Sequence, residues 1–376
     1  MKNIVVLGST GSVGKQVMEV LRKKPGYYKV LGISGYEEIS ELNSQIKEFK
    51  PEMVCVGTKK AKRKLESAFK KIKIYVGENG LKKLATHPKA EVIEISTSGT
   101  VALEPMLEAI RRKKEILLAN KESLIIGGDL ISLALKKYKT QLLPLDSEHS
   151  AIFQCLKGER KIEIKNLILT CSGGPLRNYT KKKLEKVTRD KVLSHPVWKM
   201  GSKITVDSAS LMNKGFEVIE AHHLFQIPYH KIKVVVHPEC IIHSMVEFQD
   251  GTIKALLSQP DMRLPIQYAL FHPQRLTGFL EDLDLTKIKT FSFLKPDRKL
   301  FPCLNLAYAA GEIGGTMPAV LNFADEIAVE MFLNNEIEFL NIPQIIGKII
   351  KKHQPIFNPN LKEILAVKNW VRNQLK

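Results

Sequence analysis

Apolar runs of strand length alternate with amphipathic segments along residues 1–145. The first run, Ile4–Leu7, is uniformly apolar, which is typical of a parallel strand that is buried on both faces. Similar runs follow at Val30–Ser34, Met53–Val56, Ile72–Val76, Val92–Ser96, Ile116–Ala119 and Gln141–Leu145. Helical patterns lie between them, for example up to Arg22 and over residues 101–112. This alternation predicts an α/β fold with a Rossmann-like, doubly wound parallel sheet.

The pattern changes after residue 145. Further strands are expected at Leu167–Thr170, Ile232–Val236, Ile242–Phe248 and Thr252–Leu257, with a hairpin turn at Asp250-Gly251 and a helix over Asp207–Glu220. Residues 146–275 therefore predict an α+β domain. Residues 276–299 have few clear periods and indicate a linker, and residues 300–376 predict a helical domain with helices at about 301–313, 319–333, 341–352 and 360–374.

Three glycines follow the first strand and open the first helix. Gly8, Gly11 and Gly14 give the spacing G-x-x-G-x-x-G, a variant of the dinucleotide fingerprint. Glycines let backbone N–H groups approach a pyrophosphate, and the helix N-terminus favours an anion. A tight structural turn between strand and helix is the alternative. The position between strand and helix favours a dinucleotide site.

Two acidic residues follow the second strand. An acid at this place normally binds a ribose 2′-hydroxyl, so Glu37 and Glu38 favour NAD on physical grounds. Alternatively, both simply open the next helix, where acidic residues suit the helix dipole. Lys59 and Lys60, which follow the third strand, could supply positive charge nearby.

Carboxylates gather in two segments that are far apart in the chain. Asp146 and Glu148 follow an apolar run, and in extended chain their side chains point the same way. Asn213, Lys214 and Glu217 share one face of the predicted helix. Three carboxylates would form an oxygen-rich site that suits Mg²⁺ or Mn²⁺. The alternative is a solvated strand end and an ordinary charged helix.

Two further segments carry candidate chemistry. Asn120, Lys121 and Glu122 lie at a strand end, which is where ligands bind in doubly wound sheets, although they could simply begin a helix. His195 and Trp198, with Met200, lie in a loop bounded by proline and glycine. Such a loop fits a lid that excludes water, and the alternative is a loop packed by its own Trp and Met.

Composition excludes several classes of protein. With 44% hydrophobic and 26% charged residues among 376, and no apolar stretch near the roughly 20 residues of a span, we expect a globular chain without a membrane partner. Five separated cysteines without a C-x-x-C pair, and no room for a signal peptide, indicate reduced thiols in a cytosol.

The net charge of +19 raises the question of a nucleic-acid partner. The basic clusters, such as Lys59–Lys64 and Lys181–Lys183, fall on different predicted helices without interleaved aromatic residues. We therefore expect mostly solvated faces and no nucleic-acid partner. The positive field would still attract phosphorylated substrates.

Nine segments together resemble the 1-deoxy-D-xylulose 5-phosphate reductoisomerase family. They are GSTGSVG at Gly8, LLANKES at Leu117, LDSEHSAIFQCL at Leu145, SGGP at Ser172, SHPVWKMG at Ser194, DSASLMNKGFEVIEA at Asp207, IIHSMVEFQDG at Ile241, PDMRLPI at Pro260 and FPCLNLAY at Phe301. They occur in the family's order across nearly the whole chain. The acidic segment and the N-K-G-x-x-E helix are highly specific as a pair.

The resemblance implies an enzyme of isoprenoid (isoprene) biosynthesis by the non-mevalonate route. Such an enzyme isomerises the phosphorylated sugar 1-deoxy-D-xylulose 5-phosphate and reduces the product with NADPH to 2-C-methyl-D-erythritol 4-phosphate. It also implies Mn²⁺ or Mg²⁺ (with Co²⁺ possible), a homodimer and a cytoplasmic location. Whether Glu148 or a metal-bound water moves the proton stays open.

The resemblance also assigns roles to residues. Asp146, Glu148 and Glu217 would hold the metal, and Glu148, Lys214 and His195 would be catalytic. The substrate would be bound by nine residues: Lys121, Ser147, Glu148, Ser172, His195, Ser208, Asn213, Lys214 and Glu217. Its phosphate would lie near Ser172, Ser208 and Asn213. Trp198 and Met200 would belong to a flap over about 172–202, and Thr10, Gly11, Ser12, Val13, Asn120, Glu122 and Gly201 would contact NADPH.

The sequence departs from the family at a few positions. Glu37 stands where the family usually offers Lys or Arg beside the 2′-phosphate, and Tyr36 where glycine is common. Ala102 replaces a common glycine, and Glu239-Cys240 a more neutral pair. An alternative function is another NAD(P)-dependent dehydrogenase that acts on a small phosphorylated substrate. That enzyme would need neither the carboxylate triad nor the N-K-G-x-x-E helix.

Overall fold

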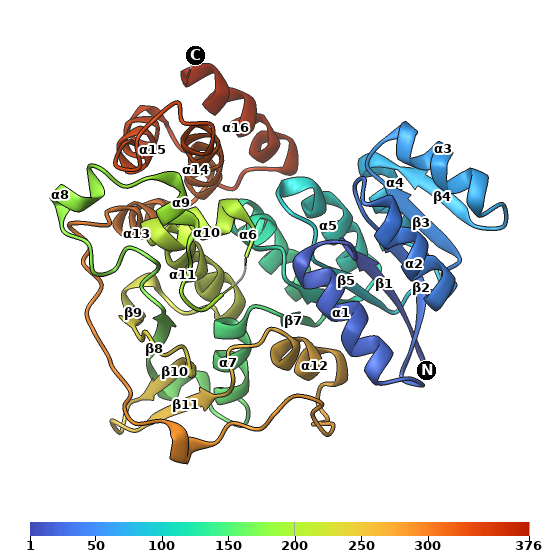
Figure 1. Ribbon diagram of the computed structural model, residues 1–376, viewed down its shortest axis with the longest axis horizontal. Helices are drawn as coiled ribbons and strands as arrows, with labels where there is room; N and C mark the ends of the chain where they lie inside the picture. Colours follow the sequence, from blue (N-terminus) through green and yellow to red (C-terminus); the bar gives the residue numbers. More distant parts are fainter. Residues whose placement is uncertain (199, 376) are drawn as a thin grey trace. The chain divides into compact units, whose positions relative to one another are not determined.

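The computed structural model describes residues 1–198 and 200–375, and the chain divides into two compact units (Figure 1). Unit 1 comprises Met1–Ser123, Leu130–Ser150 and Asp261–Glu281. Unit 2 comprises Leu124–Asp129, Ala151–Pro260 and Asp282–Lys376. The finer division into domains at 1–145, 146–275, 276–299 and 300–376 stays a prediction.

Unit 1 is built on a seven-stranded sheet in which every neighbouring pair is parallel, so the predicted Rossmann-like α/β class is confirmed. Its strands are β1 (Lys2–Leu7), β2 (Tyr28–Ser34), β3 (Met53–Val56), β4 (Lys73–Val76), β5 (Val92–Ile95), β6 (Glu115–Leu118) and β7 (Leu142–Pro144). The strand order is β4-β3-β2-β1-β5-β6-β7. Successive strands are added on one side of β1 up to β4 and on its other side from β5 onward, so the strand order reverses between β1 and β5. In such sheets, ligands bind beyond the carboxyl ends of the strands at this point.

Helices connect these parallel strands. They are α1 (Ser12–Lys23), α2 (Ile39–Phe49), α3 (Lys59–Ala68), α4 (Gly77–Ala85), α5 (Leu103–Arg111) and α6 (Lys121–Tyr138). Helix α7 (Ser147–Cys155) follows β7 and is divided between the two units after Ser150, whereas α12 (Arg263–Phe271) lies wholly in unit 1. Thr58 caps α3 by accepting from the Ala61 N–H, and Asn120 caps α6 by accepting from the Ser123 N–H.

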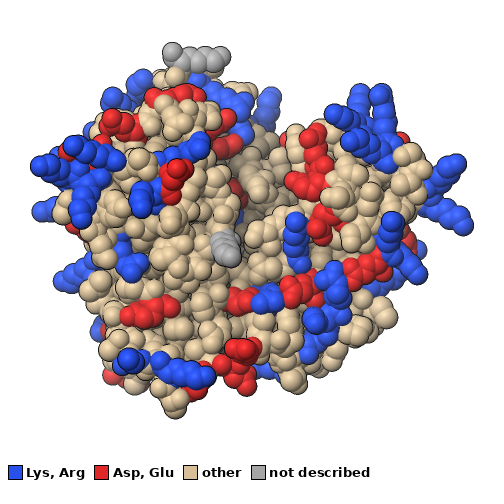
Figure 2. Space-filling model, viewed as in Figure 1, with Lys and Arg blue, Asp and Glu red and all other residues tan. Residues whose placement is uncertain are grey.

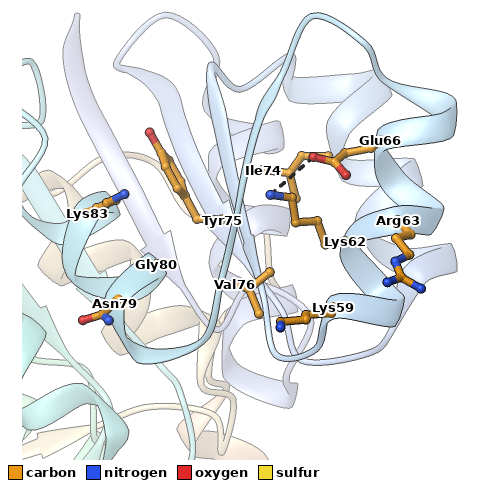
Figure 3. Close-up of a pocket in the computed structure, with 10 residues that line it drawn as sticks. All are labelled: Lys59, Lys62, Arg63, Glu66, Ile74, Tyr75, Val76, Asn79, Gly80 and Lys83. Carbon is orange, nitrogen blue, oxygen red and sulfur yellow. Dashed lines mark ion pairs between the residues drawn. The ribbon is translucent and has the colours of Figure 1, made fainter.

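The basic cluster Lys59–Lys64 lies along α3, and most of its side chains are exposed, as expected for a solvated helix face. Figure 2 shows Lys and Arg side chains spread over the visible face of the molecule. A cavity of about 410 Å³ lies where α3 and α4 flank the edge strand β4 (Figure 3). There Lys62 pairs with Glu66 at 3.4 Å, and Lys83 lies over the Tyr75 ring. Charged side chains beside an edge strand oppose pairing with another chain.

Unit 2 contains a mixed four-stranded sheet of order β11-β10-β8-β9. The strands are β8 (Ile164–Cys171), β9 (Ile232–Val236), β10 (Ile242–Phe248) and β11 (Ile253–Leu257). The predicted hairpin is confirmed, since β10 and β11 are antiparallel and Gly251 in their turn has φ of 87°. The predicted linker contains one short 3₁₀ turn, Leu285–Lys287, and Leu294 bridges to Val236.

The helices of unit 2 correct one prediction and confirm others. They are α8 (Lys181–Leu184), α9 (Arg189–Leu193), α10 (Ser202–Ser210), α11 (Met212–Phe225), α13 (Cys303–Ile313), α14 (Met317–Leu333), α15 (Asn341–Lys352) and α16 (Leu361–Gln374). The last four match the predicted helices. The single helix expected over Asp207–Glu220 is wrong, because Leu211 adopts a left-handed conformation (φ 62°) and separates α10 from α11.

Close packing fixes α11 on α13. A β-carbon at Gly215 would lie 2.4 Å from the Ala307 Cβ, so only glycine allows this approach. The glycine of the N-K-G-x-x-E segment therefore serves packing, while its neighbours carry polar chemistry. Among the described residues, none of the helices is long and apolar enough to cross a bilayer.

Candidate active site

The glycine loop joins β1 to α1 and has the geometry of an anion cradle. Gly8 has φ of 99°, and a β-carbon at Gly14 would lie 2.1 Å from the Gly8 carbonyl oxygen, so α1 packs directly on the turn. Gly11 is the N-cap of α1 and offers no side chain to its first amides. Gly11 and Ser12 are exposed, with Val13 partly so. Uncapped N–H groups at a helix start suit a pyrophosphate.

The two acids after β2 have different surroundings. Thr10 Oγ1 donates to the Glu38 carboxylate at 3.1 Å, and the Glu37 N–H donates to it at 3.2 Å. Burial would raise the pKa of Glu38, but these hydrogen bonds outweigh it and lower the pKa. Glu38 is also the N-cap residue of α2, which matches the alternative that it opens a helix. Glu37 is exposed.

Asn120 ties two strand-end loops together. Its side chain is 2% exposed, and its Nδ2 donates to the carbonyl oxygens of Thr97 and Gly99, each at 2.7 Å. The same amide donates to the Glu122 carboxylate at 3.0 Å. The loop after β5 and the start of α6 are thus fixed to each other at the carboxyl edge of the sheet.

The acidic segment differs from its predicted extended form. Helix α7 begins at Ser147, so Asp146 precedes the helix and Glu148 lies in its first turn. The Asp146 carboxylate accepts from the Glu148 N–H at 3.3 Å, and its carbonyl oxygen from the Ser150 N–H at 2.8 Å. Aspartate is a preferred residue at a helix start, which explains why the strand ends here. Ser147 Oγ donates to the Glu148 carboxylate at 2.5 Å.

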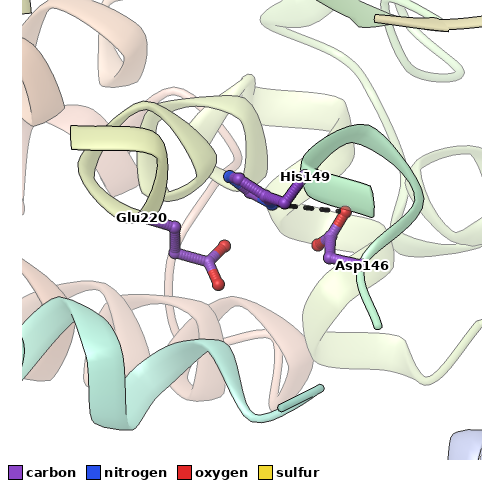
Figure 4. A group of neighbouring side chains, drawn as sticks. All are labelled: Asp146, His149 and Glu220. Carbon is purple, nitrogen blue, oxygen red and sulfur yellow. Dashed lines mark ion pairs between the residues drawn. The ribbon is translucent and has the colours of Figure 1, made fainter. Parts of the chain in front are cut away.

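A lysine and a histidine flank the Asp146 carboxylate. Lys121 Nζ lies 2.6 Å from Asp146 Oδ2, and His149 Nδ1 lies 3.6 Å from Oδ1, the pair drawn with a dashed line in Figure 4. Burial alone would raise the pKa of Asp146, but Lys121 and His149 hold that pKa well below its usual value. Asp146 is therefore an anionic oxygen donor at neutral pH. Sequence reasoning missed His149, although it lies three residues after Asp146 in the quoted segment.

Helix α11 presents three polar side chains in unit 2. Lys214 and Glu217 are 3% and 2% exposed, and they form an ion pair. Asn213 Nδ2 donates to Glu217 Oε1 at 2.6 Å. Asn213 Oδ1 is buried and has no hydrogen-bond partner among the described residues. An unsatisfied buried acceptor is costly, so it indicates a place for a donor from a ligand.

The S-G-G-P turn and the loop before α10 meet at Ser172. His195 Nδ1 accepts from the N–H groups of Val197 and Trp198, at 3.2 and 2.9 Å, so the ring proton is on Nε2. That nitrogen lies 3.0 Å from Ser172 Oγ and donates to it, as does the Gly174 N–H at 3.1 Å. Burial, with Arg177 nearby, lowers the pKa of His195 and keeps it neutral.

This arrangement prepares Ser172 for an anion. Its oxygen already accepts two hydrogen bonds, so its own proton is left to donate outward. Gly174 packs against the Ser208 carbonyl oxygen, which brings Ser172 and Ser208 into one region of unit 2. The predicted flap residues Trp198 and Met200 are partly exposed, and Gly201 is the exposed N-cap of α10. Lys199 of the same segment lies outside the described residues.

Protein-family models cover most of the chain. Residues 4–128 match the model described as 1-deoxy-D-xylulose 5-phosphate reductoisomerase, and residues 142–225 match the C-terminal domain model of that name. Residues 257–374 match a model described as DXP reductoisomerase C-terminal domain.

Named relatives align along the full length. The 1-deoxy-D-xylulose 5-phosphate reductoisomerase of Caldanaerobacter subterraneus subsp. tengcongensis is 48% identical over 377 residues, covering 100% of this chain and 98% of that protein. The protein named 1-deoxy-D-xylulose 5-phosphate reductoisomerase 1 of Bacillus cereus (strain ATCC 14579) is 47% identical over 373 residues, covering 99% and 97%.

Solved structures agree with this match. A crystal structure of DOX-P reductoisomerase in complex with NADPH, fosmidomycin and magnesium superposes with a TM-score of 0.95 at 34% identity, covering 100% of this chain and 97% of that one. The 1-deoxy-D-xylulose 5-phosphate reductoisomerase of Zymomonas mobilis in complex with NADPH gives 0.93 at 37% identity, covering 99% and 97%.

Proposed function

The chain belongs to the 1-deoxy-D-xylulose 5-phosphate reductoisomerase family, and from this premise we propose which of its residues carry the reaction. The enzyme is an NADP-dependent oxidoreductase that converts 1-deoxy-D-xylulose 5-phosphate to 2-C-methyl-D-erythritol 4-phosphate with NADPH and a divalent metal. The observation that carries the assignment of residues is the orphaned, buried Asn213 Oδ1 beside the Lys214–Glu217 pair.

We propose that Asp146, Glu148 and Glu217 hold the metal. Each offers a carboxylate oxygen, and an all-oxygen donor set suits Mg²⁺ or Mn²⁺. The lowered pKa of Asp146 keeps that ligand ionised without needing a metal. Lys121 and Lys214 balance the carboxylate charge of each half of the site when no metal is bound. When bound, the metal would polarise the substrate carbonyl and stabilise negative charge on its oxygen.

The phosphate of the substrate is assigned to Ser172, Ser208 and Asn213. Support comes from the outward proton of Ser172 and the nearness of Ser208 to Gly174. Asn213 would donate to the phosphate with the amide hydrogen that Glu217 does not accept. His195 orients Ser172 through its Nε2–H and stays neutral, so it positions a donor without adding charge. Trp198 and Met200 would cover the site and exclude water when the substrate binds.

The isomerisation moves a carbon–carbon bond next to a carbonyl, so negative charge develops on the substrate oxygens. The Lys214 ammonium is buried and fixed by Glu217, and it would stabilise that charge without reorganisation. Glu148, which Ser147 holds by a hydrogen bond, is the candidate to move the proton. Lys121 would contact the same ligand oxygens from the start of α6.

NADPH fits the glycine loop. Its pyrophosphate would bind at the start of α1, to Thr10, Gly11, Ser12 and Val13. Further contacts with NADPH would come from Asn120 and Glu122 at the neighbouring strand end and from Gly201 before α10. NADPH would supply the hydride for the reduction.

The test is NADPH oxidation with 1-deoxy-D-xylulose 5-phosphate and Mn²⁺, with matched runs using NADH and using EDTA. Turnover that needs the metal and is faster with NADPH than with NADH is the expected result. Turnover that persists in EDTA would contradict the metal site and favour a simple dehydrogenase. A homodimer and a cytoplasmic location stay predictions, and light scattering of the purified chain tests the first.

A further inference from the structure

Two buried aspartates on different helices share one lysine in unit 2. Lys203 Nζ lies 2.5 Å from Asp207 Oδ2 on α10 and 2.7 Å from Asp325 Oδ2 on α14. Asp207 is 3% exposed and Asp325 is 0% exposed. One ammonium group therefore faces two carboxyl groups that have lost nearly all contact with water.

The charges of this group do not balance if both aspartates are ionised. In the described part of the chain, neither Asp207 nor Asp325 forms an ion pair with any cation other than Lys203. Burial and the neighbouring Asp325 carboxyl raise the pKa of Asp207 well above its usual value, although Lys203 opposes this. Two dehydrated carboxyl groups that face the same ammonium group repel each other when charged, which favours a proton on Asp207.

We propose that Asp207 and Asp325 share one proton, and that this protonated pair fixes α10 on α14 and so positions Ser208 for the substrate phosphate. The proton joins the two carboxyl groups, and Lys203 balances the one remaining negative charge. Asp207 and Asp325 are positioning residues, since they act through Ser208, which follows Asp207 directly in the chain. The inference rests on the phosphate site proposed above.

The surroundings of the pair leave few other places for the proton. On α13, Cys303 is buried, and burial together with Asp325 and Asp207 raises the pKa of its thiol, so it stays neutral. On α11, the Phe216 ring lies 4.8 Å from Lys203 Nζ and holds the ammonium by a cation–π contact. Neither of these two neighbours competes for the proton, so the Asp207 and Asp325 carboxyl groups are the place to look for it.

The shared proton makes phosphate binding sensitive to alkali. The pKa of Asp207 is higher in the folded chain than in the unfolded chain, so the folded chain keeps this proton to higher pH. The protonated arrangement is therefore complete at low pH and is lost as pH rises through the raised pKa. Two anions then repel each other beneath α10. We expect KM for 1-deoxy-D-xylulose 5-phosphate to rise on the alkaline side, while kcat changes less.

The test compares Asp325→Asn with Asp325→Ala. An asparagine amide donates to Asp207 and accepts from Lys203, so it keeps the geometry without a shared proton. We expect KM of Asp325→Asn to stay within about twofold of wild type at pH 7 and to lose its alkaline rise, because no proton is left to dissociate. Asp325→Ala should raise KM roughly tenfold at pH 7. Glu330→Gln, an exposed change on the same helix, should behave as wild type.

Infrared spectroscopy provides a readout that does not depend on activity. A buried protonated carboxyl gives a C=O stretching band that carboxylates lack, and we expect Asp325→Asn to lose one such band. Glu94 is a second buried acid whose pKa burial raises, so the comparison is made in a Glu94→Gln background. An unchanged band, or an alkaline rise in KM that persists in Asp325→Asn, would overturn the inference. If the wild type is inactive toward this substrate, the proposed function is overturned instead. The infrared band would still show whether the buried carboxyl group is protonated.

Discussion

Gly174 lies against Ser208, since a β-carbon at position 174 would be only 2.5 Å from the Ser208 carbonyl oxygen. Gly174 also has φ of 72°, a conformation that costs other residues roughly 1–2 kcal/mol. The S-G-G-P turn thus brings the Ser172 hydroxyl beside α10 by close backbone contact.

Replacing Gly174 by alanine should separate the two serines. We expect Gly174→Ala to raise KM for the substrate at least roughly tenfold, since a clash with backbone has no flexible side chain to relieve it. The affinity for NADPH, measured by fluorescence quenching, should stay unchanged. Gly251→Ala is the matched control, because Gly251 has φ of 87° but no atom near its missing β-carbon. It should lower thermal stability and leave KM as it is.

The Glu217 carboxylate is held on one oxygen by Asn213 and on the other by Lys214. Glu217→Gln removes the charge and sets an amide N–H against one of these donors. We expect metal-dependent turnover to fall roughly 100-fold or more, and Mn²⁺ affinity measured by calorimetry to fall with it.

NADPH binding to Glu217→Gln should be intact, because the glycine loop is a separate element. Glu312→Gln, an exposed change on α13, is the control and should retain full activity. Full activity in Glu217→Gln would contradict the assignment of Glu217 as a ligand.

The sequence predicted the sheet of unit 1 because its strands are apolar runs between helices, and the observed β3, Met53–Val56, has the predicted bounds. The start of α7 was misjudged because an aspartate after an apolar run suits both a strand end and a helix N-cap. The break at Leu211 carries no signal, since leucine rarely adopts φ of 62° and tertiary packing imposes it.

The site divides in the same way. Five site residues could be predicted because polar groups gathered on one helix face or at a strand end are poorly suited to cover a core and well suited to bind a ligand. They are Asp146, Glu148, Asn213, Lys214 and Glu217. Asp325 could not be predicted, because it lies in a predicted helix beside Glu326, and a pair of acids in a helix is ordinarily a solvated face. Its partner Asp207 is joined to it only by the packing of α10 on α14, and no periodicity reports such a contact.

Glu94 lies in the centre of β5 with 0% exposure, and Ser96 Oγ donates to it at 3.2 Å. Burial raises its pKa well above the usual value, so the folded chain holds it protonated. Stability is therefore lost as pH rises above the unfolded glutamate pKa of about 4.3 toward the raised value.

Replacing Glu94 by glutamine keeps the shape without a titrating proton. We expect Glu94→Gln to raise stability by on the order of 1 kcal/mol at pH 8 and to flatten the dependence of Tm on pH. Melting curves by circular dichroism between pH 6 and 8 check this. Glu78→Gln, an exposed change in the same unit, should keep the wild-type slope.

Glu37 provides the last prediction, which concerns the choice of cofactor. It is exposed directly after β2, where an acid repels the 2′-phosphate of NADPH and suits the 2′-hydroxyl of NADH. The Glu38 carboxylate already accepts from Thr10 and from the Glu37 N–H, so we expect Glu37 to be the acid that faces the ribose. We expect the wild type to bind NADPH with weak preference over NADH.

Reversing the charge at Glu37 should sharpen that preference. Changing the side-chain charge from −1 to +1 near a phosphate dianion should alter the binding free energy by about 1–2 kcal/mol at high dielectric. Glu37→Lys should therefore raise the ratio of NADPH to NADH affinity roughly tenfold. Calorimetry with both cofactors and with 2′,5′-ADP measures it without turnover. Glu66→Lys makes the same charge change on α3, at the edge of the sheet, and should leave the ratio unchanged. Equal shifts in both variants would mean that net charge, and not Glu37, sets the preference.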